Sequence, residues 1–218
     1  MRKPKICAAI TNNDGKAIAE VEPLVDLFEL RIDLVGEGWQ DIARQLKKPW
    51  IACNRTPEEG GRWPGIEARR IESLLLAIEM GASMVDIELS TKNLDNVVQV
   101  IKKRAKCLLS FHDLQSTPSL DKMKEIVGRQ LKAGADICKV VTTAQKVEDN
   151  LAVLRLISES PEAKLVSFAM GPLGAMSRVL SPLVGGEFTY ASIEAGKESA
   201  PGQIAVRDLI QIYDMVKE

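Results

Sequence analysis

Short apolar runs alternate with amphipathic stretches from one end of the chain to the other. The apolar runs, rich in β-branched residues, predict strands near 5–10, 27–33, 49–54, 84–89, 106–112, 137–142, 164–170 and 188–193. The stretches between and after them, several with apolar residues at i, i+3 and i+4, predict helices near 15–22, 39–47, 65–80, 92–104, 119–133, 146–160, 173–181 and 202–217. Strict alternation of strand and helix predicts a parallel sheet.

Eight strand and helix units suit a closed (β/α)8 barrel better than an open sheet, although 218 residues is short for that fold. By period-2 parity, polar residues share one face of several predicted strands: Glu29, Arg31 and Asp33; Asp86 and Glu88; Ser110 and His112. An open sheet covered by helices on both sides would bury these charges without a common partner, whereas a barrel brings them together in one lumen. We therefore expect a single α/β domain over residues 1–218, a (β/α)8 TIM barrel.

The charges of the chain are balanced, which limits the kinds of partner. Lys and Arg number 29 against 30 Asp and Glu, for a formal net charge of -1, so no overall field attracts nucleic acid or an anionic membrane. No segment reaches the ~18 apolar residues of a membrane span, and the first residues lack the apolar stretch of a signal peptide. With 45% hydrophobic and 27% charged residues, the composition is that of an ordinary soluble protein, which we expect in the cytoplasm.

The cysteines of the chain are spread over four strand-like segments: Cys7, Cys53, Cys107 and Cys138. No pair has the spacing of zinc ligands. We expect them to be reduced core residues, as is usual in a cytosolic protein.

Lys139 interrupts an apolar strand-like run over 137–141, where an ammonium group is poorly solvated. Burial disfavours the charged form and lowers the pKa, which gives an amine able to attack a carbonyl. The alternative is a lysine that reaches solvent at the barrel mouth or pairs with a carboxylate. On its position alone, Lys139 fits either interpretation.

His112 is the only histidine, and it lies at the end of the fifth predicted strand. It is a candidate proton carrier if it faces the same cavity as Lys139, and a hydrogen-bonded core residue otherwise. The fifth and sixth strands are neighbours in a barrel, so contact between the two residues is geometrically plausible. The pair indicates an enzyme more strongly than either residue alone.

Two other kinds of site compete with this interpretation. Asp86, Glu88 and His112 could assemble a metal from strand ends, but such sites usually use more than one histidine, so we expect no metal. Gly185 and Gly186 precede the eighth strand, at the opposite rim from a barrel phosphate site, which disfavours a phosphorylated substrate. Arg178, after the seventh strand, fits a carboxylate-binding residue or a plain surface arginine.

Two loops are rich in charged or small residues. The segment 54–62 follows the third strand and is typical of substrate clamps as well as of solvated loops. The segment 195–203 follows the eighth strand, and its glycines and small residues suit a mobile lid or a plain flexible loop.

The ordered set of these motifs resembles the type I 3-dehydroquinate dehydratase family over nearly the whole chain. Each motif alone is weak, and the set in this order is specific. The matching residues are Glu29-Leu30-Arg31-Ile32-Asp33, Arg55 with Glu59 and Gly60-Gly61, Asp86-Ile87-Glu88-Leu89, Ser110-Phe111-His112-Asp113, Lys139, Met170-Gly171, Ser177-Arg178 and Ser199-Ala200-Pro201-Gly202-Gln203.

The resemblance implies a cofactor-free lyase that removes water from 3-dehydroquinate by syn elimination, giving 3-dehydroshikimate in the shikimate pathway of aromatic amino acid biosynthesis. It implies a Schiff base on Lys139 and acid and base catalysis by His112 in the elimination, with assistance to carbinolamine formation and to hydrolysis of the imine. It also implies that Glu59 and Asp86 orient the imidazole. It also implies a (β/α)8 barrel that is often a homodimer. By the family pattern, Arg178 binds the substrate carboxylate, and Met170 and Phe188 form apolar walls. The residues that hold the ring hydroxyls and the lid are Glu29, Arg31, Arg55, Ser199 and Gln203, with Ala200 beside them.

Two other functions remain open on the residues alone. A Schiff-base aldolase on the same barrel would share Lys139 but make or break a C–C bond. A non-catalytic barrel that binds a small acid or a partner protein would keep the lumen charges without a convergent geometry.

Overall fold

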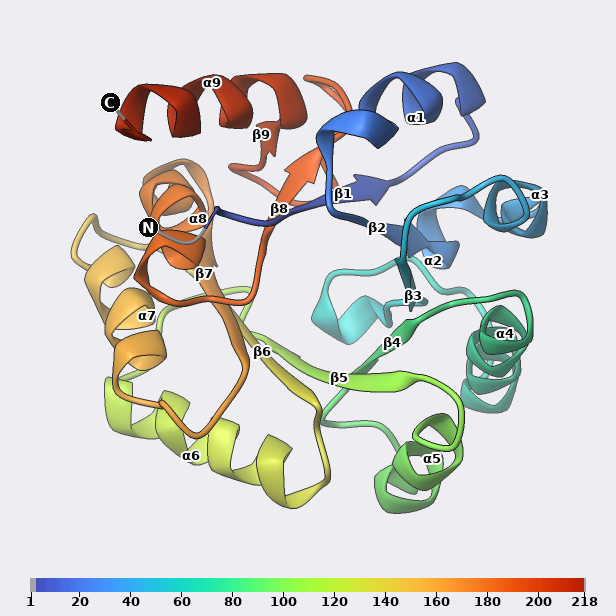
Figure 1. Cartoon of the computed structure of the whole chain (residues 1–218). Helices are drawn as coiled ribbons and strands as arrows, with labels where there is room; N and C mark the ends of the chain where they lie inside the picture. Colours follow the sequence, from blue (N-terminus) through green and yellow to red (C-terminus); the bar gives the residue numbers. More distant parts are fainter. Residues whose placement is uncertain (1–2, 218) are drawn as a thin grey trace.

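The strands form one parallel sheet in the order β7-β6-β5-β4-β3-β2-β1-β8-β9 in the computed structural model, which describes residues 3–217. Strands that follow one another in sequence are neighbours, and β1 pairs with β8, so the sheet has the strand order of a barrel. Helices surround the strands (Figure 1). The predicted (β/α)8 fold is confirmed. The strands are β1 Ile6–Ile10, β2 Leu27–Arg31, β3 Trp50–Cys53, β4 Met84–Glu88, β5 Lys106–His112, β6 Ile137–Thr143, β7 Leu165–Met170, β8 Thr189–Ser192 and β9 Ile204–Ala205.

The helices follow the predicted order. They are α1 Gly15–Val21, α2 Ile32–Val35, α3 Trp39–Ala43, α4 Glu67–Glu79, α5 Leu94–Ile101, α6 Leu120–Lys132, α7 Asp149–Ser158, α8 Ala175–Leu180 and α9 Val206–Lys217, with short 3-10 turns at Glu22–Leu24, Pro57–Glu59, Pro172–Gly174 and Ser181–Val184. Local signals explain several boundaries: Asp14 and Ser119 accept backbone N–H groups at the starts of α1 and α6. Met1, Arg2 and Glu218 of the predicted domain lie outside the described residues.

Two short elements differ from the sequence prediction. The second strand ends at Arg31 instead of 33, because α2 begins at Ile32, so Asp33 is a helical residue and not a strand residue. The last helix begins at Val206 instead of 202, because Ile204 and Ala205 pair with β8 as a ninth strand.

The strands β7 and β8 do not pair with each other, and we call the boundary between them the seam. The backbone N–H of Glu187 donates to the carbonyl of Leu165 at one end of the seam, over 2.9 Å. The N–H of Gly171 donates to the carbonyl of Pro201 at the other end, over 3.1 Å. These two bonds join the edges of the sheet near the bottom and the mouth of the barrel.

Alternation along the strands separates two cores. One face of each strand packs against the helices, and the other faces the lumen. The lumen-side cluster is apolar: Cys7, Ile51, Met84, Leu108, Ile137, Val141, Val166, Phe168, Met170, Phe188 and Tyr190. The four cysteines are buried and free, which confirms their prediction as reduced core residues.

Among the described residues, no helix combines the length and the apolar character that crossing a membrane requires.

Candidate active site

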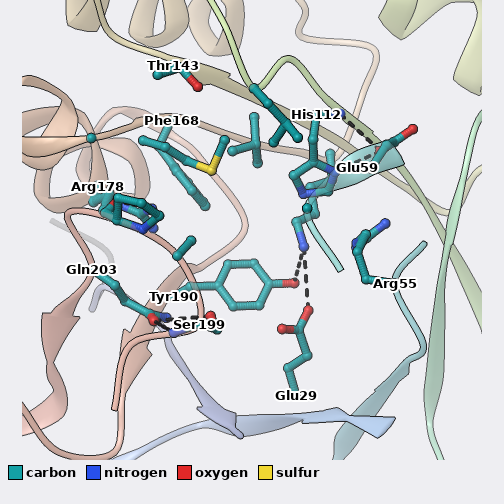
Figure 2. A pocket seen from close by; sticks show the side chains of 18 of the residues that line it. Glu29, Arg55, Glu59, His112, Thr143, Phe168, Arg178, Tyr190, Ser199 and Gln203 are labelled. Carbon is teal, nitrogen blue, oxygen red and sulfur yellow. Dashed lines mark hydrogen bonds and ion pairs between the residues drawn. The ribbon is translucent and has the colours of Figure 1, made fainter. Parts of the chain in front are cut away.

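A cavity of about 320 Å³ opens at the carboxyl ends of the strands. Side chains from strands far apart in sequence point into it, together with residues of the loops after β3 and β8 (Figure 2). This is the end of a parallel barrel at which loops assemble active sites. Its lining is Glu29, Arg31, Arg55, Glu59, Gly60, His112, Leu114, Lys139, Val141, Thr143, Phe168, Met170, Gly171, Arg178, Tyr190, Ser199, Ala200, Pro201 and Gln203.

Lys139 lines this cavity and is only 4% exposed. Its Nζ is 2.9 Å from Oδ2 of Asp86 and 3.4 Å from Oε1 of Glu29. Nζ also donates to the hydroxyl of Tyr190 over 3.2 Å and lies 4.3 Å from the centre of that ring. The amine therefore pairs with carboxylates, as one interpretation of Lys139 expected, and it also lines the cavity.

The predicted lowering of the pKa of Lys139 is wrong. Burial by itself would lower the pKa, but Asp86 and Glu29 outweigh it and raise the pKa above its ordinary value. The resting group is therefore an ammonium ion. Sequence alone cannot give this sign, because it depends on two carboxylates brought in from other strands.

Asp86 belongs to a buried network that includes Arg55. Nη2 of Arg55 is 2.7 Å from Oδ2 of Asp86, and Ser110 donates to Oδ1 over 2.6 Å. Burial would raise the pKa of Asp86, but the charges of Arg55 and Lys139 hold it well below its usual range. Asp86 thus contacts Lys139 and Arg55, and its hydrogen bonds do not include the imidazole that the resemblance assigned to it.

Glu59 holds the imidazole of His112. Its Oε2 is 2.8 Å from Nδ1 and also accepts the backbone N–H of His112 over 3.1 Å. A carboxylate at Nδ1 favours the tautomer with its proton there, which leaves the lone pair of Nε2 free. Burial, Arg55 and Lys139 lower the pKa of His112 well below its ordinary value, so the ring is neutral near pH 7. Burial raises the pKa of Glu59 to about 7.

Arg178 is a buried cation without a carboxylate partner among residues 3–217. Its guanidinium lies 4.4 Å from the centre of the Phe168 ring, and Nη2 donates to the carbonyl of Pro201 over 3.2 Å. Its Nε has no hydrogen-bond partner in the described part of the chain. Burial lowers its pKa to about 9. A buried, uncompensated guanidinium facing a cavity suits an anionic ligand, a carboxylate above all.

Arg31 also lines the cavity, and Asp33 fixes it. The two residues form a bidentate pair over 2.9 and 2.7 Å. The hydrogen bonds and charge of Asp33 outweigh burial and raise the pKa of Arg31, which keeps it a cation. Asp33 therefore supports Arg31 from α2, although it was predicted to be a residue of the strand.

The segment after β8 folds over one side of the cavity. The N–H and the hydroxyl of Ser199 both donate to Oε1 of Gln203, over 2.7 and 3.1 Å. Gly202 has a positive φ of 77°, and a Cβ there would clash with the carbonyl of Gly171. Ala200 lies between these contacts and lines the cavity, so the predicted lid residues come together.

The apolar wall differs in part from the prediction. Met170 lines the cavity, but Phe188 does not. Phe188 lies in the apolar layer next to Tyr190, with ring centres 5.5 Å apart. Tyr190 and Phe168 supply the aromatic surface instead, and sequence reasoning missed both. Tyr190 lies two residues after Phe188, and Phe168 lies two residues before Met170, so each shares a strand face with a residue that was predicted. This period-2 parity was the signal that could have found them.

The acidic residues of the alternative metal site are bound to cations. Glu88 pairs with Arg55 over 2.9 Å and with Arg70 over 2.6 Å. Asp86 pairs with Arg55 and Lys139, so these donors are not arranged for a divalent ion. Glu29, Cys53 and Asp86 also bring ligand atoms within 4.8 Å of one another, but both carboxylates already hold Lys139.

Comparisons of the sequence with known proteins identify one family. The family model described as Type I 3-dehydroquinase matches residues 6–218. The chain is 44% identical over 216 residues to a 3-dehydroquinate dehydratase of Dehalococcoides mccartyi, covering 99% of this chain and 97% of the relative. It is 36% identical over 219 residues to a 3-dehydroquinate dehydratase of Methanocaldococcus jannaschii, covering 97% and 98%. The structure of a 3-dehydroquinate dehydratase from Geobacillus kaustophilus superposes with a TM-score of 0.84 at 27% identity, covering 99% and 92%.

Proposed function

The chain belongs to the type I 3-dehydroquinase family, and we propose that it converts 3-dehydroquinate to 3-dehydroshikimate with Lys139 as the nucleophile. The observation that carries the proposal is the convergence of three elements on one cavity. These are the buried amine of Lys139, the His112 and Glu59 pair, and the uncompensated cation of Arg178.

An imine on Lys139 makes the elimination possible at neutral pH. The proton beside the substrate ketone is a weak acid, and hydroxide is a poor leaving group. The iminium withdraws the electrons that the departing proton leaves behind, so a modest base suffices. Asp86 and Glu29 stabilise the positive charge, which stays on nitrogen when the ammonium becomes an iminium.

His112 is the proposed acid and base of the elimination. Its Nε2, free because Glu59 holds Nδ1, takes the proton beside the iminium. The resulting imidazolium then protonates the departing hydroxyl, which leaves as water from the same face. Glu59 holds the ring in place and stabilises the charge that the ring carries between the two steps.

The carboxylate of the substrate is proposed to bind Arg178. The remaining donors of Arg31 and Arg55, which their acidic partners do not use, would hold the ring hydroxyls together with Glu29. Ser199, Ala200 and Gln203 would close over the ligand from the lid. Met170, Phe168 and Tyr190 would exclude water from the imine.

The test of this function is trapping of the imine. We expect incubation with 3-dehydroquinate and borohydride to add the mass of the reduced substrate to Lys139, as read by intact mass and peptide mapping. Lys139→Ala should lose both the adduct and turnover, whereas Lys197→Ala, a change of an exposed lysine in the lid segment, should keep the adduct. Undiminished turnover without an adduct would contradict the proposal.

A Schiff-base aldolase would also give an adduct, so the product separates the two reactions. The dehydratase forms a conjugated enone, which absorbs in the ultraviolet, and cleaves no C–C bond. A non-catalytic barrel would give no product at all.

We further propose that residues 1–218 act as one catalytic domain and as a homodimer, in the cytoplasm, within the shikimate pathway of aromatic amino acid biosynthesis. Light scattering at micromolar concentration tests the oligomeric state. A monomer with full activity would contradict the dimer.

A further inference from the structure

The phenol of Tyr190 is a buried polar group that the steps above leave without a chemical role. Its hydroxyl accepts a hydrogen bond from Nζ of Lys139 over 3.2 Å, the contact drawn as a dashed line in Figure 2. Among residues 3–217, the hydroxyl of Tyr190 donates no hydrogen bond of its own. The hydroxyl therefore faces the reacting nitrogen on one side and has a proton free to donate.

The ring of Tyr190 is held in a fixed orientation. It makes edge contacts with Phe168 and Phe188, with ring centres 6.0 and 5.5 Å apart. The residue lies in β8, opposite Cys7 of β1, and is 4% exposed. Because neighbours on both sides fix the ring, the hydroxyl meets Nζ without reorganisation.

Formation of the imine requires proton movement that this contact suits. An ammonium ion and a ketone give an iminium ion and water with no net change in protons. The C–N bond forms, the C–O bond breaks, and two of the three protons on nitrogen end on the departing oxygen. Nitrogen and oxygen are joined to the same carbon in the intermediate, so direct transfer passes through a strained four-membered ring. A neighbouring group that accepts one proton and donates another avoids that strain.

We propose that Tyr190 is a further catalytic residue, which relays a proton from Nζ of Lys139 to the ketone oxygen of the substrate as the imine forms. The phenol takes a proton from nitrogen and gives its own to oxygen, so it is regenerated in each transfer. The proposal rests on the Schiff-base function above. It adds Tyr190 to formation of the imine and leaves the elimination with His112.

The surroundings of both residues support this division. His112 has one nitrogen committed to Glu59, which leaves Nε2 for the proton on carbon. Burial and the nearby charge of Glu29 raise the pKa of Tyr190 well above its ordinary value, so the phenol keeps its proton at working pH. The carbinolamine oxygen is bonded to the carbon that Nζ attacks. This oxygen therefore lies within reach of the Tyr190 hydroxyl, which is already hydrogen-bonded to Nζ.

The test is Tyr190→Phe, which removes one oxygen and keeps the ring contacts. Enzyme in excess is mixed with 3-dehydroquinate and quenched with borohydride at set times, and intact mass gives the rate constant of adduct formation. We expect this rate constant to fall by ~100-fold or more. We also expect the deuterium isotope effect on kcat, for substrate labelled at the abstracted position, to fall toward 1 because imine formation becomes limiting.

Tyr213→Phe is the matched control. It removes another largely buried phenol hydroxyl, which donates to the carbonyl of Val179 over 3.0 Å, outside the cavity. Adduct formation and the isotope effect should stay at wild-type values. Equal rates and isotope effects in Tyr190→Phe and wild type would overturn the relay, whereas the absence of an adduct in wild type would overturn the Schiff-base function itself.

A second measurement does not depend on the folding of the Tyr190 variant. In His112→Ala adduct formation should be slowed far less than turnover, because the relay remains. If adduct formation in His112→Ala is as slow as turnover, the histidine carries these protons and the role of Tyr190 is refuted.

Discussion

Replacing Arg178 with methionine is expected to stabilise the free protein while weakening substrate binding. The guanidinium is buried, faces no carboxylate among residues 3–217, and has its pKa lowered by burial to about 9. Each pH unit of depression destabilises the charged folded form by ~1.4 kcal/mol, so the buried charge costs on the order of 5 kcal/mol. The contact with Phe168 and the hydrogen bond to Pro201 offset ~2–3 kcal/mol of this. Methionine should therefore raise the free energy of unfolding by ~2 kcal/mol.

The pH dependence of this effect has a definite sign. Arginine is charged in the folded and the unfolded chain at neutral pH, so the penalty is fully present below the folded pKa of about 9. It disappears only as the pH rises above that value toward the ordinary pKa of arginine. The difference between variant and wild type should therefore be constant from pH ~6 to ~8.

Urea denaturation without substrate measures the difference. Arg155→Met in α7 is the matched control, because Arg155 is an exposed residue paired with Glu159 and its replacement should change stability by less than ~0.5 kcal/mol. Steady-state kinetics should show KM for 3-dehydroquinate raised by ~30-fold or more, since losing one partner of a buried charge pair costs at least ~2 kcal/mol. An Arg178→Met protein less stable than wild type, with equal m-values, would refute the idea of an uncompensated charge.

Other expected outcomes concern the proton chemistry, the lid and metal. His112→Ala should lower kcat by ~10²–10⁴-fold, and near-normal turnover would remove His112 from the elimination. Wild-type kcat/KM should fall as the pH drops below about 7, because burial raises the pKa of Glu59 to about 7 and its protonated form loses its hold on Nδ1. Glu59→Gln should be slow at every pH and lack this step, and the same step in the variant would contradict the assignment. Gly202→Ala should raise KM, because a Cβ at φ 77° clashes with the carbonyl of Gly171 and displaces the lid; an unchanged KM would argue against that. Activity should survive dialysis against a chelator, and a loss that a divalent ion restores would favour the metal alternative.

Much of the fold followed from the sequence, because its determinants are local. Alternation of apolar runs and helical periods predicted the barrel. Period-2 parity placed Glu29 and Arg31 on the strand face that lines the lumen. Lys139 and His112 stood out because each is chemically unusual where it lies. The assignment of Phe188 to the cavity wall failed, because the order of motifs does not say which of two aromatic residues on one strand face reaches the cavity.

The electrostatics of the site could not be read from the sequence. The pKa of Lys139 depends on distances of 2.9 and 3.4 Å to carboxylates from two other strands, which are properties of the folded chain. The same holds for Asp86, whose partners are Arg55 and Lys139 instead of the imidazole. The pairing of Asp33 with Arg31 was not predicted either, because Asp33 lies in a short helix that the strand pattern did not indicate.

The barrel can open most easily at the seam between β7 and β8. Elsewhere in the ring, opening would break a ladder of strand hydrogen bonds, whereas two backbone bonds join the described edges here, from Glu187 to Leu165 and from Gly171 to Pro201. The carbonyl of Pro201 is also the acceptor for Arg178. Loss of the contact at the mouth would release the lid and the guanidinium of Arg178 together. Hydrogen exchange should therefore be fastest in the Gly171 amide and the lid amides, and ligand binding should slow both as one cooperative unit.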